Sequence, residues 1–280
     1  MNGVVDWASL TWLRSLGMKS RWVETSRGRL HVLDGPGQGS LPPVVLLHGL
    51  GARATHFRFL VKELLPHHRR IIVPDLLGHG LSDVPTDFDG VDVTTTGTEA
   101  LLQLIDEPVV LFGNSMGGKG AILFASAHPD RVHKLVASAP AGAQLAHDEL
   151  RDWISRFYVD SHQDSIRVVK QTFARDFSLP MLHFVAWGAR KQLNAPTVRR
   201  LLDATSTRDC LLPEQVQSLA MPTLLLWGQQ ERMMEPHHLA WFQANLPAHA
   251  RVERPDGYGH SPFLECPGLL AEHILKHAST

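Results

Sequence analysis

The chain has 280 residues, of which 44% are hydrophobic, so it can bury a large core as one α/β domain or as a domain with an insertion. Its net charge is −1 with acidic and basic residues interspersed, which argues against a nucleic-acid partner because no long-range field attracts one. The two cysteines, Cys210 and Cys266, have no metal-binding spacing and no disulfide framework, which is typical of a reducing compartment.

The first twenty residues predict an amphipathic helix. Trp7, Leu10, Trp12 and Leu13 have rough helical spacing over residues 1–20. We expect these tryptophans to pack on the protein's own surface, with a weak membrane or self contact as the alternative. The segment lacks the features of a signal peptide, which predicts a cytoplasmic location. No stretch reaches the roughly 20 apolar residues that span a bilayer, so no transmembrane segment is expected.

Strand and helix patterns alternate along the next part of the chain. Residues 22–25 and 30–33 flank a short turn and predict an antiparallel hairpin. Residues 44–47 and 71–73 are short apolar runs typical of strands buried on both faces of a parallel sheet, and residues 54–65 between them have a helical pattern. This alternation predicts parallel strands joined by right-handed crossovers.

The most informative stretch begins with the apolar run at residues 109–112. It leads directly into Gly113-Asn114-Ser115-Met116-Gly117, a Gly-x-Ser-x-Gly sequence, and then into a helical pattern up to residue 128. That order predicts a strand, a sharp turn and a helix, with the glycines giving the backbone room and the Ser115 hydroxyl exposed. The alternative is a glycine-rich turn that carries an incidental serine.

After a further strand at residues 135–138, strand patterns are missing for nearly eighty residues. Apolar spacing predicts one helix around residues 150–158 and a second around residues 166–173, with Asp164 and Ser165 as candidate caps, and Asn194-Ala195-Pro196 opens a third. Strands resume at residues 223–227. We therefore predict a helical cap at residues 142–219, inserted into an α/β core of residues 21–141 and 220–280.

Two later strands end in titratable residues. Residues 223–227 lead to Glu231, and residues 250–254 lead to His260. Ligands bind at the carboxyl ends of parallel strands, so Ser115, Glu231 and His260 can converge there although they are far apart in sequence. The order serine, acid, histidine is that of the catalytic triad in α/β-hydrolases.

Four motifs occur in the order that this family has. They are His48-Gly49-Leu50-Gly51, the segment from Asp75 to Asp83, the Gly-x-Ser-x-Gly turn, and Gly259-His260-Ser261-Pro262. From the hairpin to the last helix the chain resembles a capped serine α/β-hydrolase, similar to carboxylesterases, monoacylglycerol-lipase-like enzymes and meta-cleavage-product hydrolases. The resemblance implies an α/β fold with a mostly parallel central sheet flanked by helices. Related dehalogenases and epoxide hydrolases usually carry aspartate at the turn, so the serine argues against both activities.

The chemistry of the three residues suggests their roles. A neutral His260 can take the proton from the Ser115 hydroxyl as it attacks, and the Glu231 carboxylate can hold the other ring nitrogen of the histidine. The resemblance places the two oxyanion-hole donors on the backbone of Leu50 and Met116. We prefer Glu231 to Glu235 as the acid, because Glu235 precedes a proline at a predicted helix start.

Other polar residues in these motifs are expected to have structural roles. His48 should support the oxyanion loop, and Asp75, His79 and Asp83 should order the loop that follows their strand. The pairs at residues 67–68 and 237–238 are expected to be solvated, and no metal site or cofactor is predicted.

The sequence therefore predicts a serine hydrolase that cleaves carboxylic esters of small to medium apolar acyl groups through an acyl-enzyme intermediate. Its partner would be a small-molecule ester. Two alternatives stay open, which are hydrolysis of a carbon–carbon bond in a vinylogous diketone and a non-catalytic ligand-binding protein with the same fold. Aromatic residues of the cap are expected to form part of an apolar acyl pocket, namely Trp153, Phe157, Phe173, Phe184 and Trp187.

Overall fold

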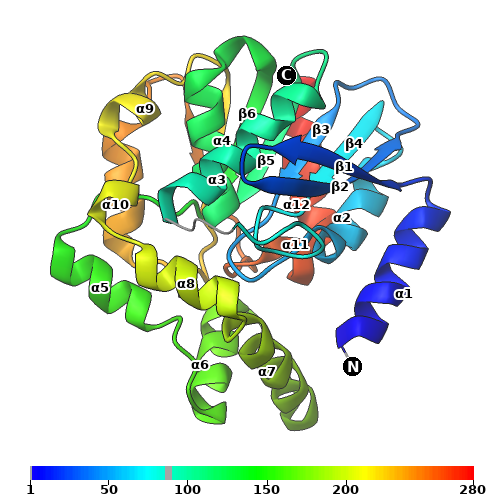
Figure 1. Ribbon diagram of the computed structural model, residues 1–280. Helices are drawn as coiled ribbons and strands as arrows, with labels where there is room; N and C mark the ends of the chain where they lie inside the picture. The colour runs from blue at the N-terminus through cyan, green and yellow to red at the C-terminus, as the bar shows by residue number, and fades with distance from the viewer. Residues whose placement is uncertain (1, 86–89) are drawn as a thin grey trace.

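One eight-stranded sheet organises the protein, with the strand order β1-β2-β4-β3-β5-β6-β7-β8 (Figure 1). The computed structural model describes residues 2–85 and 90–280. β1 pairs antiparallel with β2 and β2 with β4, and every other neighbouring pair is parallel. The strands are β1 Lys19–Thr25, β2 Gly28–Pro36, β3 Val44–Leu47, β4 Arg70–Pro74, β5 Val109–Asn114, β6 Val132–Ser138, β7 Thr223–Leu226 and β8 Arg251–Glu253.

Helices connect the parallel strands and cover both faces of the sheet. Those that pack on the sheet are α1 Asn2–Ser15, α2 Arg58–Leu64, α3 Gly90–Glu99, α4 Met116–Ala127, α9 Pro213–Gln217, α10 Pro236–Asn245, α11 Pro262–Glu265 and α12 Pro267–Ser279. Between β6 and β7 the chain also forms α5 His147–Ser155, α6 His162–Thr172, α7 Leu179–Leu193 and α8 Pro196–Ala204. Short 3₁₀ turns are η1 Ala54–Phe57, η2 Ala100–Gln103, η3 Pro129–Arg131 and η4 Thr207–Asp209.

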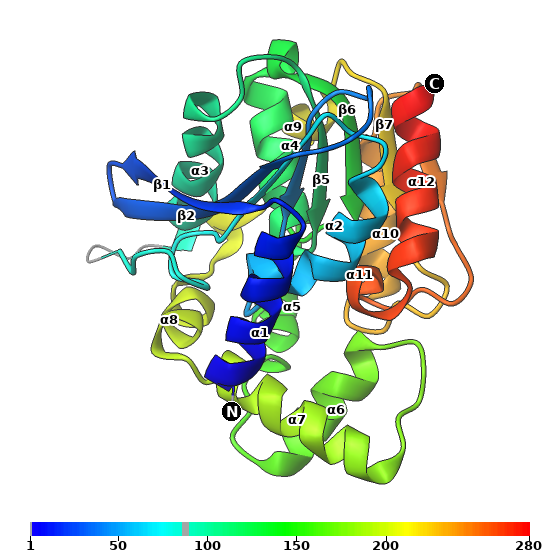
Figure 2. The same ribbon diagram turned by 90° about the vertical axis from the view of Figure 1, so that its right-hand side faces the viewer.

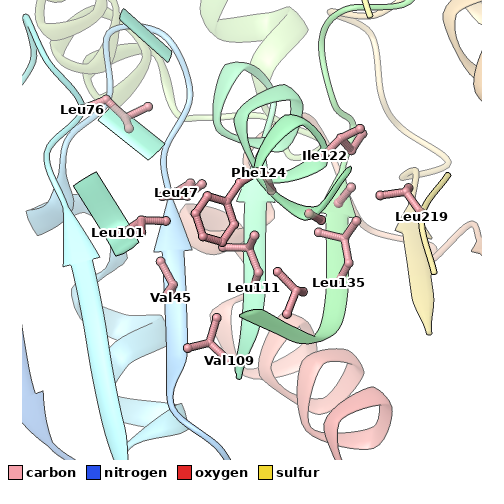
Figure 3. Packing of buried hydrophobic residues seen from close by; sticks show 14 of the residues in the cluster. Val45, Leu47, Leu76, Leu101, Val109, Leu111, Ile122, Phe124, Leu135 and Leu219 are labelled. Atoms are coloured by element: carbon pink, nitrogen blue, oxygen red, sulfur yellow. The ribbon is translucent and has the colours of Figure 1, made fainter. Parts of the chain in front are cut away.

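The buried strands supply two separate layers of core, because successive side chains of a strand point to opposite faces. On one face, Val45, Leu47 and Leu111 pack with Ile122 and Phe124 of α4 (Figure 3). On the other face, alternate strand residues pack with η1, α2 and α12, and the sheet separates these helices from α3 and α4 (Figure 2). These layers fix where each parallel strand ends. The strand ends in turn position the candidate site.

The sheet and its flanking helices confirm the predicted α/β class. The hairpin and the strand at residues 44–47 lie where the sequence pattern predicted them. Asp164 and Ser165 were wrong as the predicted N-cap residues of the helix around residues 166–173. That helix is α6, which begins four residues before Ile166, and its N-cap is Ser161. The Ser161 hydroxyl accepts the N–H of Asp164, so Asp164 lies in the first turn and not before it. That first turn is polar and carries no apolar periodicity, which is why the pattern missed it.

Helices α5 to α8 gather at one end of the sheet (Figure 1). Their apolar side chains form two small clusters, with Leu150, Ile154 and Val168 in one and Val169 and Leu182 in the other. Leu201 of α8 and Val216 of α9 also belong to the main core, so the helical layer is joined to the sheet through them. The helical layer over the strand ends is thus built by α5 to α8.

Helix α1 packs along the sheet face that carries α2. Leu13 is fully buried in that layer, and the Trp12 ring lies 5.9 Å from the Phe59 ring. Trp7 is 66% exposed, so only one of the two tryptophans packs as expected. Among the helices of residues 2–85 and 90–280, none has the length and apolar character needed to cross a bilayer.

Candidate active site

Ser115 occupies the one-residue junction between β5 and α4. Its backbone has φ 55° and ψ −119°, a region that L-residues rarely adopt and that costs about 1–3 kcal/mol of strain. Gly113 and Gly117 on either side of Ser115 leave room for the neighbouring backbone to pass close to this junction. A Cβ on Gly113 would lie 2.2 Å from the carbonyl oxygen of Gly117, and a Cβ on Gly117 would lie 2.3 Å from that of Leu47. The turn therefore requires glycine at both positions.

Backbone hydrogen bonds hold Ser115 in that conformation. Its N–H donates to the carbonyl of Ser138 on the neighbouring strand at 3.0 Å. Its carbonyl accepts from the N–H groups of Lys119 and Ala141, each at 3.0 Å. The junction is thus tied to β6 as well as to its own helix, which holds the serine at the carboxyl edge of the sheet.

His260 and Glu231 meet across two neighbouring loops. The Nδ1 of His260 lies 2.8 Å from Oε2 of Glu231, and only 1% of the Glu231 side chain is exposed. The other carboxylate oxygen, Oε1, accepts the N–H groups of Met233 at 2.7 Å and Met234 at 3.0 Å. Both oxygens are therefore satisfied, and Nε2 of His260 has no hydrogen-bond partner in the part of the chain that the structure describes.

The electrostatics of the pair keep Glu231 ionised. Burial alone would raise the pKa of this carboxyl, but the charge and hydrogen bond of His260 and the N–H groups of Met234 and Met233 lower the pKa overall. An ionised carboxylate is the form that can fix the histidine tautomer and stabilise an imidazolium.

The loop that carries His260 is anchored from two directions. The amide nitrogen of Asn114, the residue before Ser115, donates to the carbonyl of His260 at 2.8 Å. The backbone N–H of His260 donates to the carbonyl of Thr172 at the end of α6, also at 2.8 Å. The sequence pattern indicated neither anchor, because both depend on how distant loops pack.

The loop after β3 brings Leu50 beside the serine. A Cβ on Gly49 would lie 3.1 Å from the Cβ of Ser115, so this loop lies against the Ser115 turn. Throughout residues 2–85 and 90–280, no acceptor is found for the backbone N–H of Leu50. Met116 is the first residue of α4, where N–H groups have no partner within the helix. Leu50 and Met116 both line the same pocket as Ser115.

His48 holds that loop in place, in line with its expected structural role. Its Nδ1 donates to the carbonyl of Gly49 at 2.8 Å, and its Nε2 accepts the N–H of Leu76 at 3.0 Å. Burial lowers the pKa of His48, which favours the neutral form that this donor and acceptor pair requires. The loop after β3 is thereby linked to the loop after β4.

Asp75 and its neighbours order the loop after β4. The buried carboxylate accepts the N–H of Ala54 at 2.6 Å, the N–H of Leu81 at 3.0 Å and the Nδ1–H of His31 at 2.9 Å. His79 is also buried, and burial lowers its pKa to about 3. Asp83 instead pairs with Arg29 at the edge of the sheet. None of these groups lines the pockets that Ser115 lines.

Two lobes of one cavity meet at Ser115, and they share Leu50 and Phe157. The first, which we call the Trp153 lobe, encloses about 810 Å³ including its mouth, and the second, the Phe173 lobe, about 1390 Å³. The Trp153 lobe lies beneath α5 and α8 and includes Met116, Leu150, Ile154, Leu201 and Leu202. The Phe173 lobe is lined by His260, α6 and α7 and includes Val169, Phe184 and Leu193.

The structure separates the five aromatic residues that were predicted to line an acyl pocket. Trp153 and Phe157 line the Trp153 lobe, and Phe173 and Phe184 line the Phe173 lobe. Trp187 lies outside both lobes and is 43% exposed, so its predicted place in the pocket is corrected. It follows Phe184 by three residues on α7, and the helical pattern did not distinguish a residue that lines the cavity from one that does not.

Two histidines that were expected to be solvated are buried. His68 donates from Nδ1 to the carbonyl of Pro42, and His238 accepts the N–H of Glu235 at 3.2 Å. His238 lines the Trp153 lobe, and burial lowers its pKa to about 4. Within residues 2–85 and 90–280, no three histidine, cysteine, aspartate or glutamate side chains are grouped so that they could hold a metal ion.

Comparison with known proteins identifies the family. The sequence model of the alpha/beta hydrolase fold family matches residues 42–267. The sn-1-specific diacylglycerol lipase ABHD11 of Mus musculus is 30% identical over 267 residues, which cover 88% of this chain and 83% of that protein. The chain therefore belongs to the α/β-hydrolase fold family, and the predicted resemblance to its esterases and lipases is confirmed.

Solved structures share the fold over almost the whole chain. Carboxylesterase CesB (YbfK) of Bacillus subtilis has a TM-score of 0.77 at 19% identity, covering 98% of this chain and 97% of that one. The 2-hydroxy-6-oxo-6-phenylhexa-2,4-dienoate hydrolase (BphD) of Rhodococcus sp. strain RHA1 has a TM-score of 0.78 at 22% identity, covering 94% and 99%. At these identities the likeness establishes the fold alone.

Proposed function

We propose that the protein is a serine hydrolase that cleaves carboxylic esters of small to medium apolar acyl groups through an acyl-enzyme intermediate. The observation that carries the proposal is the 2.8 Å contact between His260 and a buried Glu231, in a cavity that the strained Ser115 also lines. Backbone strain of this kind persists only where surrounding structure enforces it, and it clusters at active sites.

In this proposal Ser115 attacks the ester carbonyl carbon while Nε2 of His260 takes the hydroxyl proton. Glu231 holds Nδ1–H and stabilises the imidazolium that forms. The backbone N–H groups of Leu50 and Met116 stabilise the negative charge on the carbonyl oxygen. The alcohol then leaves with the proton from His260, and a water molecule activated by the same histidine releases the acid.

The two lobes receive the two parts of the ester. His260 must protonate the leaving alcohol, and it lines only the Phe173 lobe, so the alcohol lies there. The acyl chain then occupies the Trp153 lobe, where the rings of Trp153 and Phe157 pack edge to face with their centroids 5.1 Å apart. Residues 142–219 act as the cap in this proposal, since α5 to α8 supply most walls of both lobes.

Ester cleavage is preferred to carbon–carbon bond cleavage because the relative at 30% identity is named as a lipase. The diketone hydrolase is similar in fold alone. A purified sample should therefore hydrolyse p-nitrophenyl butyrate and hexanoate faster than a vinylogous diketone. The reverse ranking would support the carbon–carbon hydrolase.

A fluorophosphonate probe tests the mechanism directly. The wild-type protein should be labelled covalently and should turn over esters, and Ser115→Ala should lose both while keeping its circular dichroism spectrum. Absence of labelling in the folded wild-type protein would favour a non-catalytic, ligand-binding protein. His260→Ala should be as damaging as Ser115→Ala, and the double variant no worse, because the residues of a triad act as a unit.

A further inference from the structure

The Trp153 lobe has a polar end although most of its walls are apolar. Lys119, Asp209 and Cys210 line this lobe, and the same three residues line a separate hollow that also includes Glu99 and Arg208. They therefore form the partition between the lobe and that hollow. Thr205 and Ser206 lie beside them in the lining of the lobe. An acyl chain that fills the lobe would end at this partition.

Asp209 presents an unused acceptor at the partition. The residue is 8% exposed, and its Oδ2 accepts the backbone N–H of Ser206 at 2.9 Å and the hydroxyl of Ser206 at 3.1 Å. Its Oδ1 is buried without a hydrogen-bond partner among the described residues. Buried acceptors are nearly always paired, so this oxygen marks a place where a donor is missing.

Lys119 presents unused donors at the same place. It lies on the first turn of α4, and its backbone N–H donates to the carbonyl of Ser115 at 3.0 Å. Its ammonium group makes no hydrogen bond or ion pair with any part of the chain that the structure describes. Burial lowers the pKa of Lys119, and the charge of Asp209 opposes that shift, so the two side chains lie within electrostatic reach of each other.

We propose that this end of the Trp153 lobe is a subsite for a hydroxyl group carried at the distal end of the acyl chain. The hydroxyl oxygen accepts from Lys119 and its O–H donates to Oδ1 of Asp209, so one neutral group satisfies both. A terminal methyl satisfies neither side chain. A terminal carboxylate satisfies Lys119 but meets the negative charge of Asp209. This inference rests on the proposed ester hydrolysis and names its substrate class.

The test compares two series of methyl esters by pH-stat titration, the n-alkanoates and the ω-hydroxyalkanoates from four to ten carbons. The ratio of kcat/KM for the hydroxylated over the plain ester should peak at one chain length, at roughly tenfold, the size expected for a hydrogen bond to a charged group. A ratio near one at every length would overturn the inference. Absence of hydrolysis in both series would instead refute the proposed ester hydrolysis.

Two variants at the partition separate recognition from a general loss of activity. Lys119→Met should bring the peak ratio to about one. Asp209→Asn places an amide nitrogen where Oδ1 was, so the hydroxyl preference should fall and ω-carboxylate esters should become better substrates. The exposed Lys62 on α2 offers a matched control, and Lys62→Met should keep the wild-type ratio. An unchanged ratio in both folded partition variants would refute the subsite.

Discussion

Glu235 forms an ion pair with Arg156, the C-cap residue of α5, and its second carboxylate oxygen lies 3.3 Å from Nδ1 of His237. Glu235 also provides the N-cap residue of α10. The Glu235 carboxylate therefore contacts both the helical layer and α10. It lies four residues after Glu231, whose carboxylate contacts His260. The two glutamates have similar sequence surroundings and different partners.

Replacement of each glutamate by glutamine distinguishes these roles. Glu231→Gln should lower kcat severely, by up to about 10⁴-fold by analogy with amide replacement in a Ser-His-Asp triad. Glu235→Gln keeps the shape of the side chain and loses one partly exposed ion pair, so kcat should change little. Steady-state kinetics across pH 6 to 9 measures both. Near-normal kcat in Glu231→Gln, or a large loss in Glu235→Gln, would reverse the assignment of the acid.

The buried histidines predict how stability depends on pH. The pKa values of His79 and His238 are lowered to about 3 and about 4, whereas an unfolded histidine titrates near 6.5. Between these values the unfolded chain binds protons that the folded protein does not. These two histidines should therefore leave the free energy of unfolding unchanged above about pH 7 and lower it below 6.5, by up to about 1.4 kcal/mol per pH unit for each histidine.

Urea unfolding at pH 7.5, 6 and 5 measures this slope. Burial lowers the pKa of His56 to about 3 as well, so it adds to the same fall. His79→Gln removes one of these groups and should make the fall between pH 6 and pH 5 shallower. The lowered pKa values of Asp75 and Glu231 add a further loss only near pH 4 and below, where those carboxylates become protonated. An identical slope in the wild-type protein and in His79→Gln would contradict the role assigned to His79.

Acyl-chain selectivity should depend on Phe157, which lines both lobes. For plain alkanoate esters, each methylene buried in the Trp153 lobe should improve kcat/KM by up to about 0.8 kcal/mol until the lobe is full. Phe157→Leu enlarges the lobe, so the optimum should move to a longer chain. Trp187→Ala is the control, because that exposed ring lies outside both lobes. A flat profile from acetate to decanoate would argue against an apolar acyl site.

Two glycine-to-alanine substitutions should have opposite effects on stability. A Cβ at residue 117 would lie 2.3 Å from the carbonyl oxygen of Leu47 and 2.5 Å from that of His48. Gly117→Ala must therefore displace backbone at the Ser115 turn, and we expect a lower melting temperature and little activity. Nothing lies within 4 Å of a Cβ at Gly188 in α7, where alanine should stabilise the helix by up to about 1 kcal/mol. Equal melting temperatures for the two variants would contradict this account.

The sequence could predict the sheet and two of the three proposed catalytic positions for the same physical reason. Strands buried on both faces are recognisable as short apolar runs, and Ser115 and Glu231 each follow such a run. His260 instead follows β8, a short edge strand that is at most partly buried, so its position was predicted from the Gly259-His260-Ser261-Pro262 motif and the family order. Lys119 could also have been found, since it lies four residues after Ser115 on one helix. Its significance depends on Asp209, which no local pattern links to it.

The contents of the cavity were much less predictable. Helical spacing identified apolar faces in α5 to α8 but could not show that Phe184 lines the Phe173 lobe while Trp187 lies outside both lobes. Burial of His68 and His238 follows from loops that pack over them, which neighbouring residues in sequence do not reveal. Side-chain environments set by contacts between distant segments lie beyond pattern analysis, even where each helix is recognised.

The hydrogen bond from His260 to the carbonyl of Thr172 joins the proposed general base to the last turn of α6. A second contact runs beside it, since the N–H of Ala174 donates to Glu265 at 2.6 Å. The helical layer is held together by small clusters of its own, so it can open as a local unit before the sheet unfolds. Mild urea should then abolish ester hydrolysis while the tryptophan and amide signals of the sheet stay those of the native protein. Dilution of the urea should restore the activity within the mixing time.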